Sequence, residues 1–339
     1  MSIICGDCLE EMRKMEDNSI SAIVTDPPYG LSFMGKGWDH AVPGTEYWEE
    51  CFRITKPGGY LLCMGGSRTF HRLACAAEDA RWKIRDCIMW IYGSGFPKSH
   101  NNFGIEGYGT ALKPAYEPII MAMKPLDGTF KQNAEKWGQA GINIDGCRVE
   151  CESRPLRISG DGSRLNTLYE GGFGGSEAIG ETSKGRWPAN VILDEEAGKM
   201  LDEQSGILKS GKTTNKETED SIFGKRKMVA QEGSSGGASR FFYCAKASSS
   251  ERGEYNKHPT VKPLRLMEYL IKLVMPPKDG ILLDPFAGSG TTILAAHNLG
   301  MKAIGIEKQP EYAEIARARL ANASIKQIDP QLDLFDGCA

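Results

Sequence analysis

The stretch from Ile281 to Glu307 constrains the fold of this chain of 339 residues more than any other. An apolar run, 281–284, leads into a turn that contains Gly288 and Gly290, and a helical pattern then continues to Leu299. A second apolar run follows and ends at Glu307. Strand, glycine loop, helix and strand in this order make the βαβ unit of an α/β protein, so we expect a mostly parallel sheet.

The same stretch indicates what the loop binds. Glycines let the backbone approach a ligand closely, and a helix N-terminus can receive a carboxylate. No Gly-Lys-Ser/Thr follows, as a phosphate loop requires, and Ile293 stands where a dinucleotide-binding loop has its third glycine. Glu307 follows Asp284 by about 20 residues, the spacing of a strand-end carboxylate that binds ribose hydroxyls. A ligand with a ribose and a carboxylate, but without an obligatory phosphate, is S-adenosyl-L-methionine.

A second polar motif, Asp26-Pro27-Pro28-Tyr29, closes another apolar run, 20–24, that predicts a buried strand. The Asp26 carboxylate and the Pro27 carbonyl can both accept hydrogen bonds from an exocyclic amine. Proline fixes φ and has no N–H, so the motif is stiff and rich in acceptors. The Tyr29 ring can stack on a planar heterocycle. The alternative is an ordinary surface turn, because Asp-Pro and Pro-Pro are common in turns.

Taken together, these motifs resemble those of the β group of amino-methylating DNA methyltransferases, in particular its phage and prophage branch. In that group Asp-Pro-Pro-Tyr precedes Phe-x-Gly-x-Gly, as Asp26–Tyr29 precedes Phe286–Gly290 here. His258–Pro263 matches the family's Thr-x-Lys-Pro segment, and Cys5–Cys8 matches its Gly-Asp. The resemblance implies a class I S-adenosylmethionine-dependent methyltransferase: a doubly wound, mostly parallel, Rossmann-like α/β sheet, circularly permuted in sequence, with an inserted target-recognition region.

The resemblance also implies the residues of the site. The catalytic residues would be Asp26, Pro27, Pro28 and Tyr29, and the cofactor-binding residues Asp7, Thr260, Lys262, Asp284, Phe286, Gly288, Gly290 and Glu307. Phe286 would pack on the cofactor adenine and Asp7 would accept from its amine, while Thr260 and Lys262 would lie near the methionine end. For Asp7 and Thr260 the alternative is local turn or cap bonding. Phe33 and Trp38 could line the base pocket or simply pack in the core.

The implied activity is methyl transfer to the N6 amine of an adenine flipped out of double-stranded DNA. An Asp at the first motif position favours adenine, whereas N4-cytosine enzymes more often carry Ser. Because both bases offer an NH2 group, N4-cytosine methylation stays open. A non-catalytic DNA-binding protein with a relic methyltransferase fold is a more distant alternative. The chemistry needs no covalent intermediate, so no cysteine is required as a nucleophile.

Composition divides the chain into four parts. Residues 1–125 and 240–320 alternate in α/β fashion, and we expect them to form the catalytic and the cofactor-binding halves of one domain. Residues 126–239 are dense in Gly and Ser, with few apolar runs, and by resemblance hold the target-recognition region; a flexible insertion is the alternative. In the tail, 321–339, the segment Gln331–Phe335 resembles a peptide that docks on the replication sliding clamp, unless it covers the protein's own surface.

Charge and composition are compatible with these interpretations. The net charge of −3 does not indicate nucleic-acid binding, but the surface that contacts nucleic acid can be a local basic patch, such as the stretch 221–257. No apolar run reaches the length of a membrane span, and the N-terminus lacks a signal-peptide pattern. The ten cysteines are dispersed, so we expect reduced thiols of a cytoplasmic protein and no metal site. A homodimer is left open.

Overall fold

The computed structural model describes residues 1–31, 40–97, 99–100, 103–151, 154–158, 177–209, 216–218, 226–228, 234–245 and 261–323. The chain forms two compact units. The first comprises Met1–Cys147, Ala189–Ala197 and Cys244–Ala339, and the second Arg148–Pro188 and Gly198–Tyr243. No helix in the described ranges is long and apolar enough to cross a membrane.

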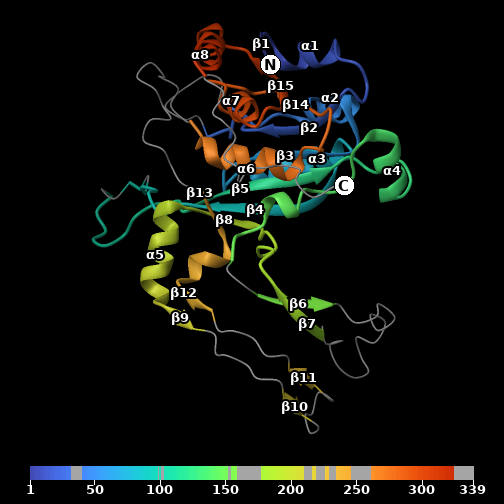
Figure 1. Cartoon of the computed structure of the whole chain (residues 1–339). Coiled ribbons are helices and arrows are strands. Elements are labelled where there is room, and N and C mark those ends of the chain that lie inside the picture. The colour runs from blue at the N-terminus through green and yellow to red at the C-terminus, as the bar shows by residue number, and fades with distance from the viewer. Residues whose placement is uncertain are drawn as a thin grey trace. The chain divides into compact units, whose positions relative to one another are not determined.

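The first unit is built on a nine-stranded sheet (Figure 1). In order across the sheet, its strands are β1 (Ser2–Cys5), β15 (Lys302–Glu307), β14 (Ile281–Asp284), β2 (Ile20–Thr25), β3 (Thr55–Met64), β5 (Tyr116–Met123), β4 (Lys83–Ile91), β8 (Val191–Asp194) and β13 (Tyr243–Ala245). The pairings from β1 to β3 are all parallel, β5 runs antiparallel to both β3 and β4, and β8 is parallel to β4. The expected doubly wound, mostly parallel α/β fold is confirmed.

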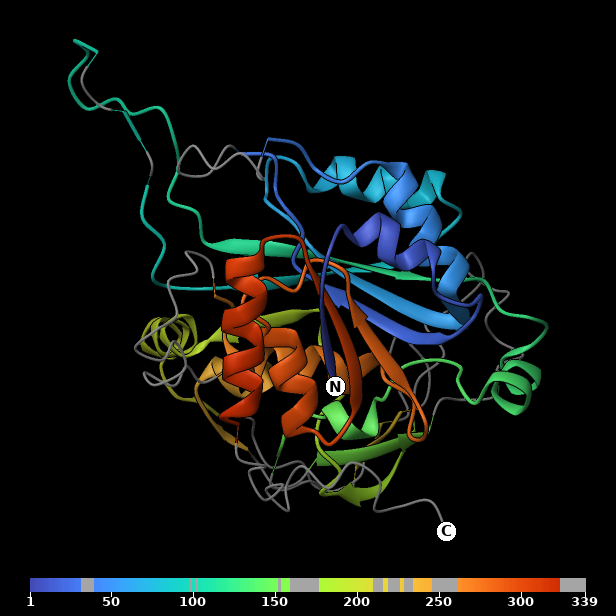
Figure 2. The same ribbon diagram turned by 90° about the horizontal axis from the view of Figure 1, so that it is seen from above.

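Helices cover both faces of this sheet. Figure 2 shows α1 (Cys8–Arg13), α2 (Thr45–Ile54) and α3 (Phe70–Asp79) on one side, and α6 (Leu264–Val274), α7 (Thr291–Asn298) and α8 (Pro310–Ala321) on the other. Because both faces are covered, the central strands are mostly apolar, and every residue of β2 is buried, as in other parallel sheets. The largest side chains of the core, among them Trp48, Met12 and Leu61, are fully buried.

The strand order reverses between β14 and β2. From β14 the chain continues through α7 to β15 on one side, whereas from β2 it continues through α2 to β3 on the other. In open α/β sheets, ligands bind in the crevice outside the carboxyl ends of the strands at such a reversal. Both motifs singled out from the sequence follow these two strands, so the topology brings them to one edge of the sheet.

The remaining elements form the second unit or lie close to it in sequence. The second unit contains three two-stranded antiparallel pairs: β6 (Arg154–Ile158) with β7 (Glu177–Thr182), β10 (Lys216–Thr218) with β11 (Arg226–Met228), and β12 (Ser235–Gly236) with β9 (Leu208–Lys209). The other elements of the chain are α4 (Phe130–Trp137), α5 (Glu195–Ser205) and the short 3-10 helices Asp145–Cys147 and Ala238–Phe241.

The second unit is smaller than the insertion expected at 126–239. The helix α4 belongs to the first unit, because the buried Asn133 donates to the carbonyl oxygens of Pro57 and Gln139. The strand β8 also belongs to the first unit, because it pairs with β4. The second unit therefore begins later than the Gly- and Ser-rich stretch and is interrupted by β8.

Candidate active site

A cleft of about 1870 Å³ lies at the carboxyl ends of β14 and β2 in the first unit. Its lining includes most of the residues predicted from the sequence: Asp7, Asp26, Pro27, Pro28, Tyr29, Lys262, Asp284, Phe286, Gly288 and Glu307. Gly290 lies behind the lining, at the start of α7. Thr260, Phe33 and Trp38 lie outside the described residues. The two motifs, far apart in sequence, thus share one cavity.

Asp284, the last residue of β14, connects the two halves of the cleft. Its Oδ1 accepts a hydrogen bond of 2.7 Å from the hydroxyl of Thr25, the last residue of β2, and one of 3.1 Å from the amide of Phe286. Asp284 is only 2% exposed, and this burial raises the pKa of its carboxyl to about 6. Its contacts therefore hold the two strand ends together.

At the end of the cleft beside β2, four polar side chains form one cluster. The Tyr29 hydroxyl lies 2.7 Å from Asp26 Oδ1 and 2.9 Å from Glu117 Oε2, so it can donate to either carboxylate. Lys262 Nζ lies 3.0 Å from Asp26 Oδ2, 2.9 Å from Glu117 Oε2 and 3.1 Å from the Tyr29 oxygen. Tyr29 and Asp26 are therefore fixed in orientation from more than one side.

Burial and charge act in opposite directions on this cluster. Burial raises the pKa of Asp26, and the ammonium of Lys262 opposes that shift. Burial alone would lower the pKa of Lys262, but the carboxylates of Asp26 and Glu117 raise it above its ordinary value. Burial also raises the pKa of Tyr29. At neutral pH, Lys262 is therefore a cation between two acids, and Tyr29 is a neutral donor.

At the end of the cleft beside β14, a tight glycine loop is closed by Glu307. Gly288 and Gly290 have φ values of 52° and 80°, which other residues rarely adopt. Glu307 Oε2 accepts from the Gly288 amide at 2.8 Å, and its Oε1 accepts from the Gln309 amide at 2.7 Å. Burial raises the pKa of Glu307. The carboxylate at the end of β15 thus lies against the loop.

Asp7 and Phe286 have defined local contacts in the same cleft. The cap bonding considered for Asp7 is present: its Oδ1 accepts from the Leu9 amide at 3.0 Å at the start of α1, and its Oδ2 lies 3.0 Å from Lys308 Nζ. The ring of Phe286 lies 6.0 Å from that of Tyr47 and 6.5 Å from that of Trp48, measured between centroids. Phe286 and Tyr47 line the cleft and give this end of it an apolar wall, and the buried Trp48 packs behind Phe286.

Sequence reasoning missed Glu117 and the contacts of Lys262. Glu117 follows the first residue of β5, and the only signal for it was an acid within the otherwise apolar run Tyr116–Met123. By resemblance, Lys262 would lie near the methionine end of the cofactor, and in the structure its ammonium contacts Asp26, Tyr29 and Glu117. Neither contact could be inferred from spacing, because 88 positions separate Tyr29 from Glu117 and 233 separate it from Lys262.

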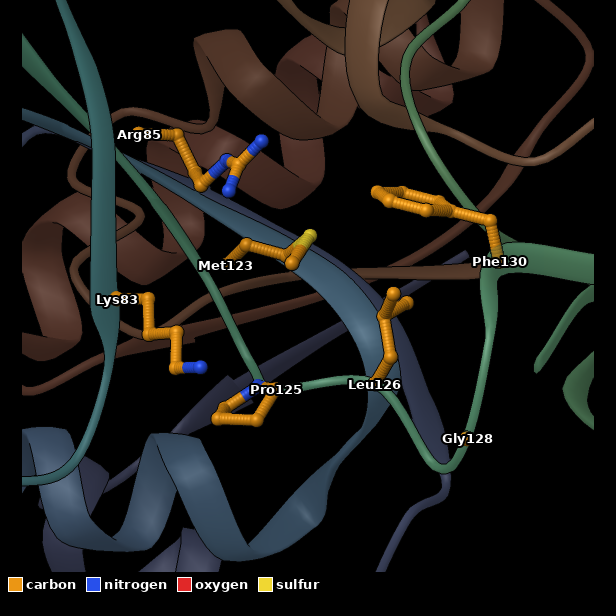
Figure 3. A pocket seen from close by; sticks show the side chains of 7 residues that line it. All are labelled: Lys83, Arg85, Met123, Pro125, Leu126, Gly128 and Phe130. Carbon is orange, nitrogen blue, oxygen red and sulfur yellow. The ribbon is translucent and has the colours of Figure 1, made fainter.

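A second hollow, of about 260 Å³, lies beside the other ends of β4 and β5 (Figure 3). Lys83 and Arg85 contribute from β4, Met123 from β5, and Phe130 from α4. Trp90 and Glu117, which line the main cleft, stand at the opposite ends of the same strands. The hollow is therefore separate from the cluster around Asp26, and its lining contains no carboxylate.

Comparison with known proteins identifies the family. The model of a family described as DNA methylase, of the N6/N4 methyltransferases, matches residues 20–318. The chain belongs to this family. Membership confirms two expectations from the sequence: a DNA methyltransferase, and S-adenosyl-L-methionine as its methyl donor.

Individual relatives are distant but span most of the chain. The type II methyltransferase M.HpaI of Haemophilus parainfluenzae is 25% identical over 94% of this chain and 73% of its own length. The DNA adenine methyltransferase YhdJ of Escherichia coli is 25% identical over 95% of this chain and 83% of its own length. The structure of the PvuII DNA methyltransferase, which is cytosine-N4-specific, aligns with a TM-score of 0.51 at 17% identity, over 96% of this chain and 88% of that one. At such identity this structural likeness supports the fold alone.

Proposed function

We propose that this methylase transfers a methyl group to the N6 amine of an adenine in double-stranded DNA, with Asp26, Pro27, Pro28 and Tyr29 as its catalytic residues. The observation that carries the proposal is the shared cleft. Asp26, whose orientation is fixed by its neighbours, lines the same cavity as the glycine loop and Glu307. One end suits an amine and the other suits the methyl donor.

The cofactor end fits S-adenosyl-L-methionine. Glu307 offers a carboxylate for ribose hydroxyls, and Phe286 offers an apolar ring for a purine. The loop at Gly288 brings backbone close to the ligand, where a side chain would intrude. Asp7 and Lys308 line the same end and add polar contacts. When bound, this cofactor supplies an electrophilic methyl group on a sulfonium.

At the other end, Asp26 and the carbonyl of Pro27 activate the amine by accepting its hydrogen bonds. The lone pair of an exocyclic amine is delocalised into the ring, so the amine is a poor nucleophile. Two acceptors aimed at its protons favour a more tetrahedral nitrogen with a localised lone pair. Tyr29 stacks on the base, which offsets part of the cost of unstacking it by roughly 1–3 kcal/mol. The protein therefore acts mainly by positioning.

The finer assignments within the family follow from the motifs. Asp at the first motif position favours adenine, and N4-cytosine methylation is the second candidate because the family contains both activities. The position of Asp26 before the glycine loop supports the permuted β group and its phage-like branch. We also propose that the enzyme acts in the cytoplasm, as a modification methylase of the restriction-modification type.

We assign target recognition to the second unit. Within it, Arg148 lies over the ring of Trp187 at 5.3 Å, and Arg186 and Arg240 lie over the ring of Phe241 at 5.0 and 4.5 Å. Trp187 is 64% exposed. Exposed aromatic rings beside guanidinium groups suit contacts with bases and phosphates. The proposed clamp peptide, Gln331–Phe335, lies outside the described residues, and the homodimer remains a prediction.

Long-read detection of modified bases tests the proposal. DNA from cells that express the wild type should carry N6-methyladenine within one sequence context, and DNA from cells that express Asp26→Ala should not. N4-methylcytosine in place of N6-methyladenine would favour the second candidate. DNA without either modification, from cells with folded protein, would refute both.

A further inference from the structure

Glu117 contacts Lys262 as closely as Asp26 does. The ammonium lies 2.9 Å from the Glu117 carboxylate and 3.0 Å from that of Asp26, and the Tyr29 hydroxyl lies between the same two acids. The side chain of Lys262 is 10% exposed, and those of Asp26 and Glu117 are each 21% exposed. The two carboxylates therefore share one cation in a largely desolvated place.

The position of Glu117 is set by the centre of the sheet. It lies on β5, which is hydrogen-bonded to β3 on one side and to β4 on the other. Its pairing partner on β4 is Trp90, which is 8% exposed and lines the same cleft. Directly opposed residues of an antiparallel pair project to the same face, so the strand aims Glu117 at the cluster. This rigidity is what a residue that orients others requires.

The charges of the cluster explain what a second carboxylate could do. With both acids ionised around Lys262, the net charge is −1, and when Asp26 takes up a proton it becomes zero. Without Glu117, protonation of Asp26 would leave the ammonium of Lys262 buried and unpaired. An uncompensated buried charge is strongly unfavourable, so Asp26 would then resist protonation.

We propose that Glu117 is a positioning residue that keeps Lys262 paired while Asp26 accepts the proton released by the methylated amine. The inference rests on the proposed function. As the C–N bond forms, the C–S bond breaks and its electron pair stays on sulfur, which leaves the nitrogen positively charged. An N–H bond then breaks, its electron pair returns to nitrogen, and the proton moves to the Asp26 carboxylate. Glu117 acts through Lys262 and Tyr29 and does not touch the base.

Other ionisable groups face the pair from neighbouring elements. Cys63 on β3, Tyr92 after β4 and Asp284 on β14 are close enough to interact with Asp26 or Glu117. Burial raises the pKa of Cys63 and of Tyr92, so both are neutral near pH 7. Asp284, with a pKa of about 6, also carries charge near pH 7, but the charges that act most on Asp26 are those of Lys262 and Glu117.

Glu117→Gln tests the inference, because glutamine retains the shape and an acceptor for Tyr29 but removes the charge. In single-turnover methyl transfer from labelled S-adenosyl-L-methionine, the rate should fall about tenfold or more. The affinities for cofactor and DNA should stay within about twofold. The acidic limb of the rate–pH profile should move to lower pH, since Asp26 loses a like-charged neighbour. Glu135→Gln, an exposed change on α4, is the matched control.

If Glu117 had a purely structural role, Glu117→Gln would lower the rate at every pH without moving the acidic limb of the rate–pH profile, and that result would overturn the inference. A rate and a pH profile equal to those of the wild type would also overturn it. If Glu117→Gln does not fold, Glu117→Asp decides, because it keeps the charge. Its limb should coincide with that of the wild type, and a displaced limb would overturn the inference. If Asp26→Ala transfers methyl groups as fast as the wild type, the proposed function is refuted, and the inference with it.

Discussion

Asp26 uses both carboxylate oxygens on its neighbours, Tyr29 and Lys262. Each oxygen has a further lone pair, so the acid can be fixed in orientation and still accept from a substrate amine. Fixed acceptors of this kind lower a barrier because they need no reorganisation when charge develops. The cluster therefore prepares the site before DNA arrives.

Asp26→Ala should lower the rate of methyl transfer by about 10²–10³-fold or more, because the aligned acceptor is lost. Lys262 stays paired with Glu117 in the variant, so the fold should persist. Calorimetry should show cofactor binding within about twofold of the wild type. Asp79→Ala, an exposed change at the end of α3, is the control. Turnover near that of the wild type would remove Asp26 from the catalytic site.

Glu307→Ala should instead weaken the binding of S-adenosyl-L-methionine. A hydrogen bond to a charged acceptor contributes about 1.5–3 kcal/mol, so the dissociation constant should rise about 10–100-fold. The amides of Gly288 and Gln309 also lose their acceptor, which loosens the loop. Titration calorimetry measures the change, with the exposed Glu311→Ala as control. An unchanged constant would place Glu307 outside the cofactor site.

The acids that sequence reasoning found share one property. Asp284 and Glu307 are the last residues of apolar runs, and Asp26 directly follows one, so local pattern and the rule for parallel sheets suffice to place them. Glu117 stands near the start of an antiparallel strand instead. Its contact with Lys262 depends on how β5 pairs with β3 and β4, which is a tertiary property that no local pattern records.

The glycine loop and α8 are coupled through one close contact. A Cβ atom on Gly290 would lie 2.7 Å from the Cβ of Ala316, well inside van der Waals contact. The loop can therefore approach α8 only because Gly290 has no side chain and adopts a left-handed conformation. The small side chain of Ala316 completes the fit.

Gly290→Ala should destabilise the protein more than Gly300→Ala, which is the matched control. Both positions have positive φ, of 80° and 67°, but an added Cβ at Gly300 would meet nothing within 4 Å. The difference in unfolding free energy should therefore report the clash alone, at about 1–3 kcal/mol. Adding Ala316→Gly to Gly290→Ala should recover part of the loss. Equal destabilisation by the two glycine changes would contradict the contact.

Most elements could be predicted from local sequence patterns, and the strands that could not are short. The strand Lys302–Glu307 and the helices near 45–54 and 264–274 follow from apolar periodicity and from their Gly and Pro stops. The short strands β8 and β13 extend the sheet beyond β5 and β4. With only four residues, β8 was too short to stand out within a Gly- and Ser-rich region.

The first unit as a whole depends on the meeting of chain segments from both ends of the sequence. The hydrogen bond between Thr25 and Asp284 spans 259 positions and joins the N-terminal and C-terminal parts of the sheet. Long-range pairing of this kind is formed late and at a cost in chain entropy. Asp284 therefore matters for folding as well as for the geometry of the cleft.

Asp284→Asn should change how the stability of the whole protein depends on pH. Burial raises the pKa of Asp284 from 3.8 to about 6 in the folded state. A raised pKa means that the neutral acid is favoured on folding, so its contribution to stability is fully present below about pH 3.8 and is lost as pH rises through about 6. Asparagine has no proton to lose and can still accept from Thr25.

The melting temperature of Asp284→Asn relative to that of the wild type should therefore increase between pH 4 and pH 7, because only the wild type loses stability at this site. Thermal unfolding followed by circular dichroism, without ligand, measures both proteins across this interval. Groups that titrate in both proteins cancel in the difference, and Asp79→Asn, at an exposed position, should show no such trend. A difference that stays constant from pH 4 to pH 7 would mean that Asp284 folds as an ordinary ionised carboxylate. In that case it would join the two strand ends through charge rather than through a buried neutral acid.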